Sequence, residues 1–398
     1  LPCILIPLFI ISCPKVESGF LMLSKRLLGI IFLALVLIVG TIFYLKSQIP
    51  KAPDSPGQNR AAKESTAPLK TIGWIPYWDQ KNAFESFSKN AQLFDFVSVF
   101  WYRIDSNGNL TTYRETVEDQ SIVDFAHQNN VKILAVVANA PDYYEDADWD
   151  YQRVNLAIST ASTRQKHISD LVQLVEAKNL DGVDIDYEAL KASQKENFSL
   201  FIEELATKLH EKGKILGVAI HPKTSEDNPN EDNGSHAQDW QRIAKSADQL
   251  YFMTYTEHAI SSSPGPAGSI GWIDEIMDYA IFNVKIPEEK IFLGIGLFGL
   301  GWQKASDGSF SGVSDDLTFG QIQSIIQQNN SQVIWDNQSK SSHFEYKKGG
   351  KTHTIWFENS ESVSARMKTA KKLGVGGVAF WRLGDEDPKV WNIIKQLK

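Results

Sequence analysis

The chain has 398 residues, of which 42% are hydrophobic and 22% are charged, a globular composition long enough for one barrel-sized domain or two smaller ones. Its formal net charge is −8, so electrostatics give no support to a nucleic-acid partner. The two cysteines are Cys3 and Cys13, which excludes thiol chemistry and disulfides from the rest of the chain.

Two apolar runs open the chain. The first, residues 1–13, has no basic residue before it, which argues against reading Ile10–Cys13 as a lipoprotein box. The second, Leu27–Leu45, contains no charge. At ~1.5 Å rise per residue it is about 28 Å long, close to the ~30 Å hydrocarbon core of a bilayer. We therefore predict a transmembrane helix over residues 27–45.

The flanking charges orient this helix. Lys25 and Arg26 precede it and only Lys46 follows closely, so residues 1–26 are expected in the cytoplasm and the rest of the chain outside. No small-residue cleavage site follows, which favours an uncleaved signal anchor over the alternative of a cleaved signal peptide. Met22 is a plausible start, in which case residues 1–21 are a mis-extended reading frame.

Residues 46–70 are rich in proline and polar residues and are predicted to form a flexible linker. From Thr71 onward, apolar runs of strand length alternate with amphipathic helical stretches. Such alternation predicts an α/β fold, and eight strands are the number that closes a (β/α)8 TIM barrel, here over residues 71–398. An open doubly wound sheet is the alternative, but no glycine-rich phosphate turn follows the first strand. The predicted strands are Thr71–Tyr77, Phe94–Tyr102, Val131–Ala138, Gly182–Glu188, Ile215–His221, Gln249–Tyr255, Ile291–Phe298 and Val375–Trp381.

The interval between the seventh and eighth predicted strands is too long for one helix. It contains a helical stretch at Gln321–Gln328, short alternating runs, and a turn signal at Lys348–Lys351. We predict a small α+β insertion at about residues 300–358.

The run from Asp181 to Glu188 contains four carboxylates in eight residues. Apolar and acidic residues alternate, so in a strand Asp184, Asp186 and Glu188 share one face. Repulsion and desolvation raise at least one pKa in such a row, which supplies the protonated carboxyl that acid-catalysed acetal cleavage requires. An edge strand with a solvated acidic face and a metal site are the alternatives. No histidine lies near the run, which argues against the metal.

This run resembles the DGxDxDxE signature of glycoside hydrolase family 18, which includes chitinases and N-acetylglucosaminidases. The resemblance implies that Glu188 is the general acid and base of a retaining, substrate-assisted reaction on N-acetylglucosamine polymers. It further implies that Asp186 orients the acetamido group of the sugar and that Asp184 shares a proton with Asp186. No metal ion or organic cofactor is implied.

Four other segments extend the resemblance. Tyr251–His258 is similar to the family's MxYD segment, in which Tyr255 would contact the acetamido group, but Thr256 stands where the family has Asp. The resemblance covers about residues 71–396. The segments Leu293–Gly299, His353–Glu358 and Trp381–Gly384 are most similar to the branch of bacterial spore-cortex and cell-wall lytic glucosaminidases.

Aromatic side chains at the ends of predicted strands are candidate sugar platforms. Trp381 matches the family tryptophan that floors the subsite of the cleaved sugar. Tyr77, Trp101 and Tyr102 are predicted to bind substrate, with burial in the core as the alternative, and Asp181 is included as the first acid of the motif.

The predicted partner is thus a polysaccharide containing N-acetylglucosamine, cut by a glycosidase that a single helix anchors to the membrane. An anchored enzyme facing the wall favours peptidoglycan over chitin, and endo or exo cleavage stays open. The rival predictions are a lectin-like binding protein and a scaffold tethered at the wall with no sugar cleft. The presence of Glu188 favours the enzyme.

Overall fold

The computed structural model describes residues 68–143, 148–227, 231–232, 234–384 and 386–398. The predicted transmembrane segment at 27–45, the residues before it and nearly all of the linker lie outside these ranges. Among the helices in the described ranges, none is both long and apolar enough to cross a bilayer.

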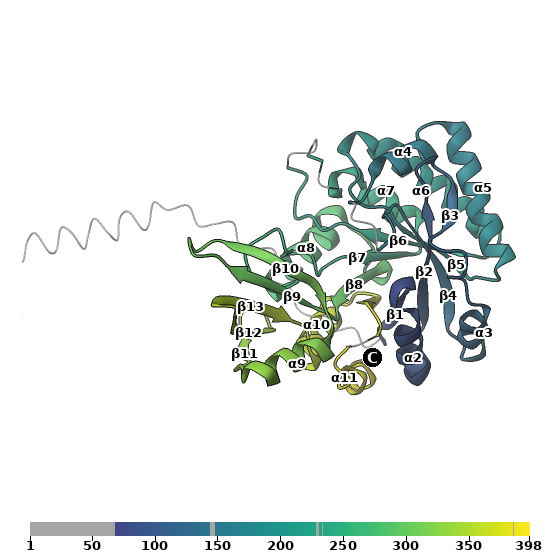
Figure 1. Cartoon of the computed structure of the whole chain (residues 1–398). Coiled ribbons are helices and arrows are strands. Elements are labelled where there is room, and N and C mark those ends of the chain that lie inside the picture. The colour runs from purple at the N-terminus through teal and green to yellow at the C-terminus, as the bar shows by residue number, and fades with distance from the viewer. Residues whose placement is uncertain (1–67, 144–147, 228–230, 233, 385) are drawn as a thin grey trace, which may run out of the picture. The chain divides into compact units, whose positions relative to one another are not determined.

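In the described residues, eight parallel strands form a closed barrel, because β1 pairs with both β14 and β2 (Figure 1). Neighbouring strands otherwise follow chain order, which confirms the predicted barrel over the open sheet. A short strand that the sequence did not predict, β3 (Leu110–Thr112), pairs antiparallel with the end of β2. The barrel strands are β1 (Lys70–Pro76), β2 (Phe96–Ile104), β4 (Lys132–Ala138), β5 (Gly182–Asp186), β6 (Ile215–Ile220), β7 (Gln249–Phe252), β8 (Ile291–Gly296) and β14 (Gly377–Trp381).

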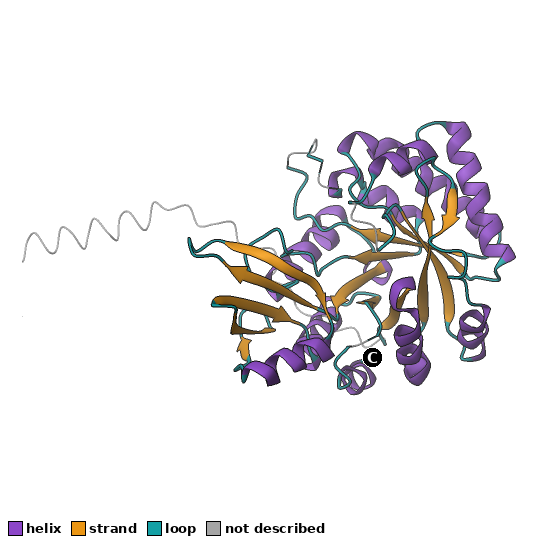
Figure 2. Ribbon diagram, in the orientation of Figure 1, coloured by secondary structure: helices purple, strands orange, loops and turns teal. Residues whose placement is uncertain are grey.

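Helices cover the outside of this barrel (Figure 2). Many begin at a polar side chain that accepts a hydrogen bond from the first turn, for example Asp119 before α3 and Thr160 before α5. They are α2 (Gln80–Asn90), α3 (Gln120–Gln128), α4 (Tyr151–Ile158), α5 (Ala161–Ala177), α6 (Lys195–His210), α7 (Trp240–Ser246), α8 (Ile270–Asp278), α10 (Ser360–Leu373) and α11 (Val390–Leu397).

The alternation within each strand divides the core in two. Outward residues such as Val183 and Ile185 pack with the helices in the larger apolar cluster. Inward residues such as Trp74, Phe100 and Tyr251 fill the barrel. Asp184, also inward, is completely buried. The barrel interior is therefore a largely aromatic core that also contains the carboxyl group of Asp184.

A second sheet lies between β8 and β14, where the α+β insertion was predicted. In the described part of the chain it is antiparallel, with the order β10-β9-β13-β12-β11. Arg382, just after β14, pairs with Asp316 of this sheet at 2.7 Å and with Asp79 at 2.8 Å, which ties the sheet to the barrel. Its elements are β9 (Gly299–Lys304), β10 (Phe310–Leu317), α9 (Phe319–Asn329), β11 (Ile334–Asp336), β12 (Ser341–Lys348) and β13 (Lys351–Phe357).

Candidate active site

The last three acids of the motif lie toward the carboxyl end of β5, but Glu188 is not on the strand. The ladder between β4 and β5 ends at the pair Ala138 and Asp186. Glu188, predicted as the last residue of its strand, follows two residues later. There the side chain of Asn139 takes the place of the backbone hydrogen bonds between the strands. Its Oδ1 accepts from the Glu188 backbone N–H at 2.8 Å, and its Nδ2 donates to the Glu188 carbonyl at 2.9 Å. One buried amide thus holds the backbone of Glu188 from both sides.

We expect Asn139→Ala to lower kcat/KM about 10- to 100-fold, since a shift of about 1 Å in a catalytic group costs rate on that scale. Asn139→Asp keeps the acceptor but loses the donor to Glu188 and Asp150, and it should be equally impaired. The measurement is steady-state hydrolysis with thermal unfolding alongside. Wild-type kcat/KM in a folded Asn139→Ala protein would show that the clamp has no role in catalysis.

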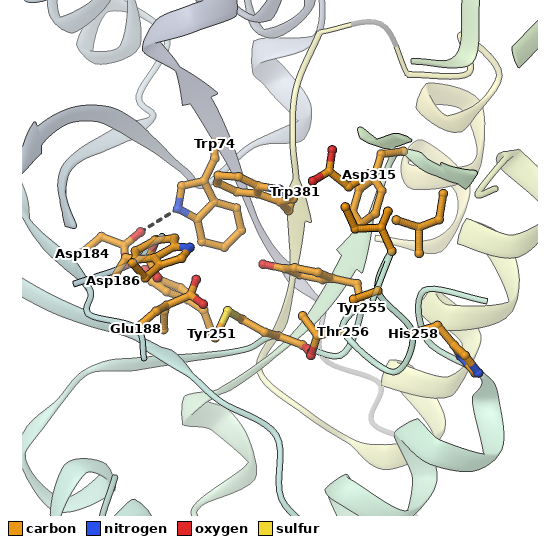
Figure 3. A pocket seen from close by; sticks show the side chains of 17 residues that line it. Trp74, Asp184, Asp186, Glu188, Tyr251, Tyr255, Thr256, His258, Asp315 and Trp381 are labelled. Carbon is orange, nitrogen blue, oxygen red and sulfur yellow. Dashed lines mark hydrogen bonds between the residues drawn. The ribbon is translucent and has the colours of Figure 1, made fainter. Parts of the chain in front are cut away.

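The acids open into a pocket of about 420 Å³. Asp184, Asp186 and Glu188 form one wall, and Tyr255 lies opposite with its hydroxyl directed toward them (Figure 3). Trp381 and Trp74 supply aromatic faces, and Asp315 of β10 reaches the pocket from the second sheet. The pocket therefore lies at the carboxyl ends of the barrel strands, where barrel active sites are found, and the insertion contributes part of its lining.

Burial dominates the electrostatics of the acids. It raises the pKa of Asp184 to about 7, although Trp74 Nε1 donates to Asp184 Oδ2 at 2.8 Å and acts in the opposite direction. Burial, with the charges of Glu188 and Asp184, raises the pKa of Asp186 well above its ordinary value. Burial also raises the pKa of Glu188 to about 7. The site thus retains protons at neutral pH.

Asp184 is the most deeply buried of the three acids. Its Oδ1 is buried, and a hydrogen bond from the Ser98 side chain lowers the Asp184 pKa, against the effect of burial. A single proton shared between Asp184 and Asp186 reduces the cost of burying two carboxylates close together.

Tyr255 reaches the acids because the neighbouring strand leaves it room. A Cβ at Gly294 of β8 would lie 2.8 Å from the Tyr255 ring and 2.2 Å from the Phe252 carbonyl. Thr256, in contrast, is exposed, and its hydroxyl turns back to the Met253 carbonyl at 3.1 Å. Position 256 therefore adds no carboxylate to the acid cluster.

The structure brings together Glu188, Asp186, Asp184, Tyr255 and Trp381, which all line the pocket. The other four predicted binding residues do not line it. Tyr77 stacks on Tyr113, with ring centroids 4.4 Å apart, and its ring also contacts that of Trp78.

Asp181 precedes β5 and therefore lies at the other end of the barrel. It accepts from the Ile133 backbone N–H at 2.9 Å and lies 3.0 Å from His127 Nε2. The structure gives Asp181 contacts that join β4, β5 and α3, in place of the predicted contact with substrate.

Trp101 and Tyr102 also take core positions. Trp101 is 1% exposed and Tyr102 is 2% exposed, both in the cluster between barrel and helices. Strict alternation with Phe100 would turn Tyr102 inward, but the register of β2 and β4 shifts between Val99 and Tyr102. This irregularity turns Tyr102 outward, where its hydroxyl donates to Glu118 at 2.8 Å.

Several pocket residues were given no role from the sequence: Trp74, Trp149, Tyr251, Met253, His258 and Asp315. Their position at or just beyond the carboxyl ends of strands, or in the insertion, is the signal that could have identified them. In the described residues, no group of three or more His, Cys, Asp or Glu side chains is arranged to hold a metal ion.

The chain is similar to several known proteins. The family described as Glycosyl hydrolases family 18 matches residues 70–387. The uncharacterized glycosylase YvbX of Bacillus subtilis is 26% identical over 335 residues, which cover 84% of this chain and 92% of that protein. The cortical fragment-lytic enzyme of Bacillus anthracis is 23% identical over 303 residues, covering 75% of this chain and 67% of that protein.

Solved structures share the fold. A chitinase from Chromobacterium violaceum has a TM-score of 0.72 at 24% identity, with 83% of this chain and 98% of that chain covered. The spore cortex-lytic enzyme SleL of Bacillus cereus also has a TM-score of 0.72, at 20% identity, with coverages of 84% and 75%. The resemblance predicted from the acidic motif, including the cortex-lytic branch, is confirmed.

Proposed function

Since the chain belongs to glycoside hydrolase family 18 and is thus a glycoside hydrolase, we propose that it cleaves β-linked N-acetylglucosamine polymers with retention, by substrate-assisted catalysis. The observation that carries this proposal is the row of Asp184, Asp186 and Glu188 opening into one pocket opposite Tyr255.

Glu188 supplies the acid. With a pKa of about 7 it is partly protonated at neutral pH, and its side chain is 25% exposed, so it is open to a substrate in the pocket. Its proton passes to the glycosidic oxygen as the bond from that oxygen to the anomeric carbon breaks. The resulting carboxylate later takes a proton from the water that attacks the anomeric carbon.

Asp186 is poorly suited to be the nucleophile that ordinary retaining enzymes use, because its raised pKa keeps it protonated or sharing a proton. The acetamido oxygen of the substrate attacks the anomeric carbon instead and closes an oxazolinium ring. Asp186 holds the acetamido N–H, Tyr255 donates to the acetamido oxygen, and Asp184 takes up proton density from Asp186. Water then opens the ring and restores the original configuration.

The substrate class is a proposal supported by two kinds of relative. One relative is named a cortical fragment-lytic enzyme and a matching structure is named a chitinase, so peptidoglycan glycan and chitin-type chains are both candidates. Trp381 would floor the cleaved sugar, since it lines the pocket and its ring centroid lies 6.0 Å from that of Trp74. The uncharged run Leu27–Leu45 supports anchoring at the membrane facing the wall, which favours peptidoglycan.

The test is hydrolysis of chitin oligomers and of peptidoglycan glycan strands by the purified full chain, with the first-formed anomer followed by NMR. We expect the β-anomer and competitive inhibition by a thiazoline analogue of the oxazolinium ring. An α-anomer as first product would contradict substrate assistance.

A lectin-like protein is the second candidate, and the position of Thr256 favours it, because the carboxylate that the family has there is replaced by an exposed hydroxyl. Binding of N-acetylglucosamine oligomers without cleavage, in a protein that regains cleavage on Thr256→Asp, would support this alternative.

A further inference from the structure

A histidine to which the proposed mechanism assigns no role lies beside the catalytic acid. His221 follows β6 directly, and its Nε2 is 3.9 Å from Glu188 Oε2. The His221 side chain is only 15% exposed, and Nε2 is buried with no hydrogen-bond partner among the described residues. Burying a polar nitrogen without a hydrogen-bond partner costs free energy. A hydrogen bond that Nε2 forms during the reaction would recover that free energy.

The backbone around His221 is firmly held. The His221 N–H donates to Gln238 Oε1 at 2.9 Å, and Gln238 Nε2 donates to the Ala219 carbonyl at 2.9 Å. Gly234 packs against the ring, where an added Cβ would lie 2.9 Å from Nε2. The ring is thus confined on the side of Gly234.

The charge state of the ring suits a hydrogen bond rather than an ion pair. Burial lowers the pKa of His221 to about 4, so the imidazole is neutral at neutral pH and has one N–H to donate. The nearby cation Lys223 is engaged elsewhere, with its Nζ 2.7 Å from Glu226 and donating to the Gln238 carbonyl at 2.8 Å. His221 is therefore a neighbour of Glu188 that can act as a neutral hydrogen-bond donor.

We propose that His221 is a positioning residue that donates an Nε2–H hydrogen bond to Glu188 Oε2 once substrate fills the pocket. The inference rests on the proposed function, in which Glu188 is the acid. The gap must close by about 1 Å, and catalytic hydrogen bonds that are long in an empty site commonly shorten in this way. The bond fixes one carboxyl oxygen, presents the other with its proton to the glycosidic oxygen, and stabilises the carboxylate after that proton has left. His221 keeps its own proton throughout.

The test compares two leaving groups. For an unactivated sugar leaving group, as in a chitin oligomer, rate depends on the proton from Glu188, whereas an aryl chitobioside with a nitrophenolate leaving group needs little protonation. We expect His221→Leu to lower kcat/KM on the oligomer by about 10- to 100-fold and on the aryl substrate by less than about threefold. His221→Gln keeps a donor of similar reach and should retain the wild-type ratio.

His221→Asn serves as the polar counterpart in case the leucine variant does not fold. Its amide falls short of Glu188, so it should show the leucine ratio rather than the glutamine ratio. His210→Leu is the matched control, since it removes another histidine next to a carboxylate, 3.0 Å from Asp248, and neither residue lines the pocket.

Equal losses on both substrates, or no loss on either, would overturn the role of His221 while leaving the proposed function intact. A wild-type protein that cleaves neither substrate would overturn both.

Discussion

Glu188→Gln is expected to lower kcat on N-acetylglucosamine polymers about 10²- to 10⁴-fold, because glutamine fills the same volume but has no acidic proton to donate. Binding should persist, since the amide replaces one side chain among many that line the pocket. The measurement is kcat and the dissociation constant for the same oligomer. The matched control is Glu211→Gln, which removes a carboxylate 54% exposed on the surface and paired with Lys208.

Glu188→Gln also tests how ionisation of the buried Glu188 affects the stability of the fold. Burial raises the pKa of Glu188 to about 7, so the folded state favours its neutral form. The stability this provides is fully present below the pKa of the unfolded chain, and it is lost as pH rises through about 7. Glu188→Gln removes this loss, so it should be more stable than wild type by roughly 1–3 kcal/mol at pH 8 and indistinguishable at pH 4.

Activity and stability would thus change in opposite directions at pH 8. The hydrolysis rate of wild type should itself fall as pH rises above about 7, since the acid loses its proton. A Glu188→Gln protein with full activity, or one less stable than wild type at pH 8, would contradict the assignment of Glu188 as a buried acid.

The barrel could be predicted because its strands are buried, and buried strands consist of short runs of apolar residues. Strands such as β4 and β8 are buried along nearly their whole length and read as short apolar runs. The missed strand β10 is mostly exposed or half-buried, so Phe310–Leu317 has no apolar alternation to find. β3 has only three residues, too few for a period.

The site was predictable only where its side chains share a strand. Asp184 and Asp186 follow the two-residue period, and that period led to Glu188, although the residue lies past the ladder. Asn139 and His221 come from other strands, and a sequence gives no distance between strand ends. For Tyr102 the two-residue period was misleading. A register shift between β2 and β4, which no residue pattern marks, turns its side chain outward.

Asp186→Asn is expected to lower kcat about 10²- to 10³-fold with a smaller change in KM, as is typical when one preorganised electrostatic group is removed. Asparagine can still hydrogen-bond the acetamido group but cannot offset the positive charge of the oxazolinium ring. Asp184→Asn should cost less, about tenfold, because its carbonyl can still accept from Trp74 and it acts on the substrate only through Asp186.

The chemical counterpart is a substrate whose acetamido groups have been replaced by free amines. Wild type should not cleave it, because no acyl oxygen is present to attack the anomeric carbon. Two results together would contradict substrate assistance: comparable rates on the deacetylated and acetylated oligomers, and wild-type kcat in Asp186→Asn. They would mean that another nucleophile attacks the anomeric carbon. In that case the raised pKa of Asp186 would reflect only its burial and the nearby charges of Glu188 and Asp184.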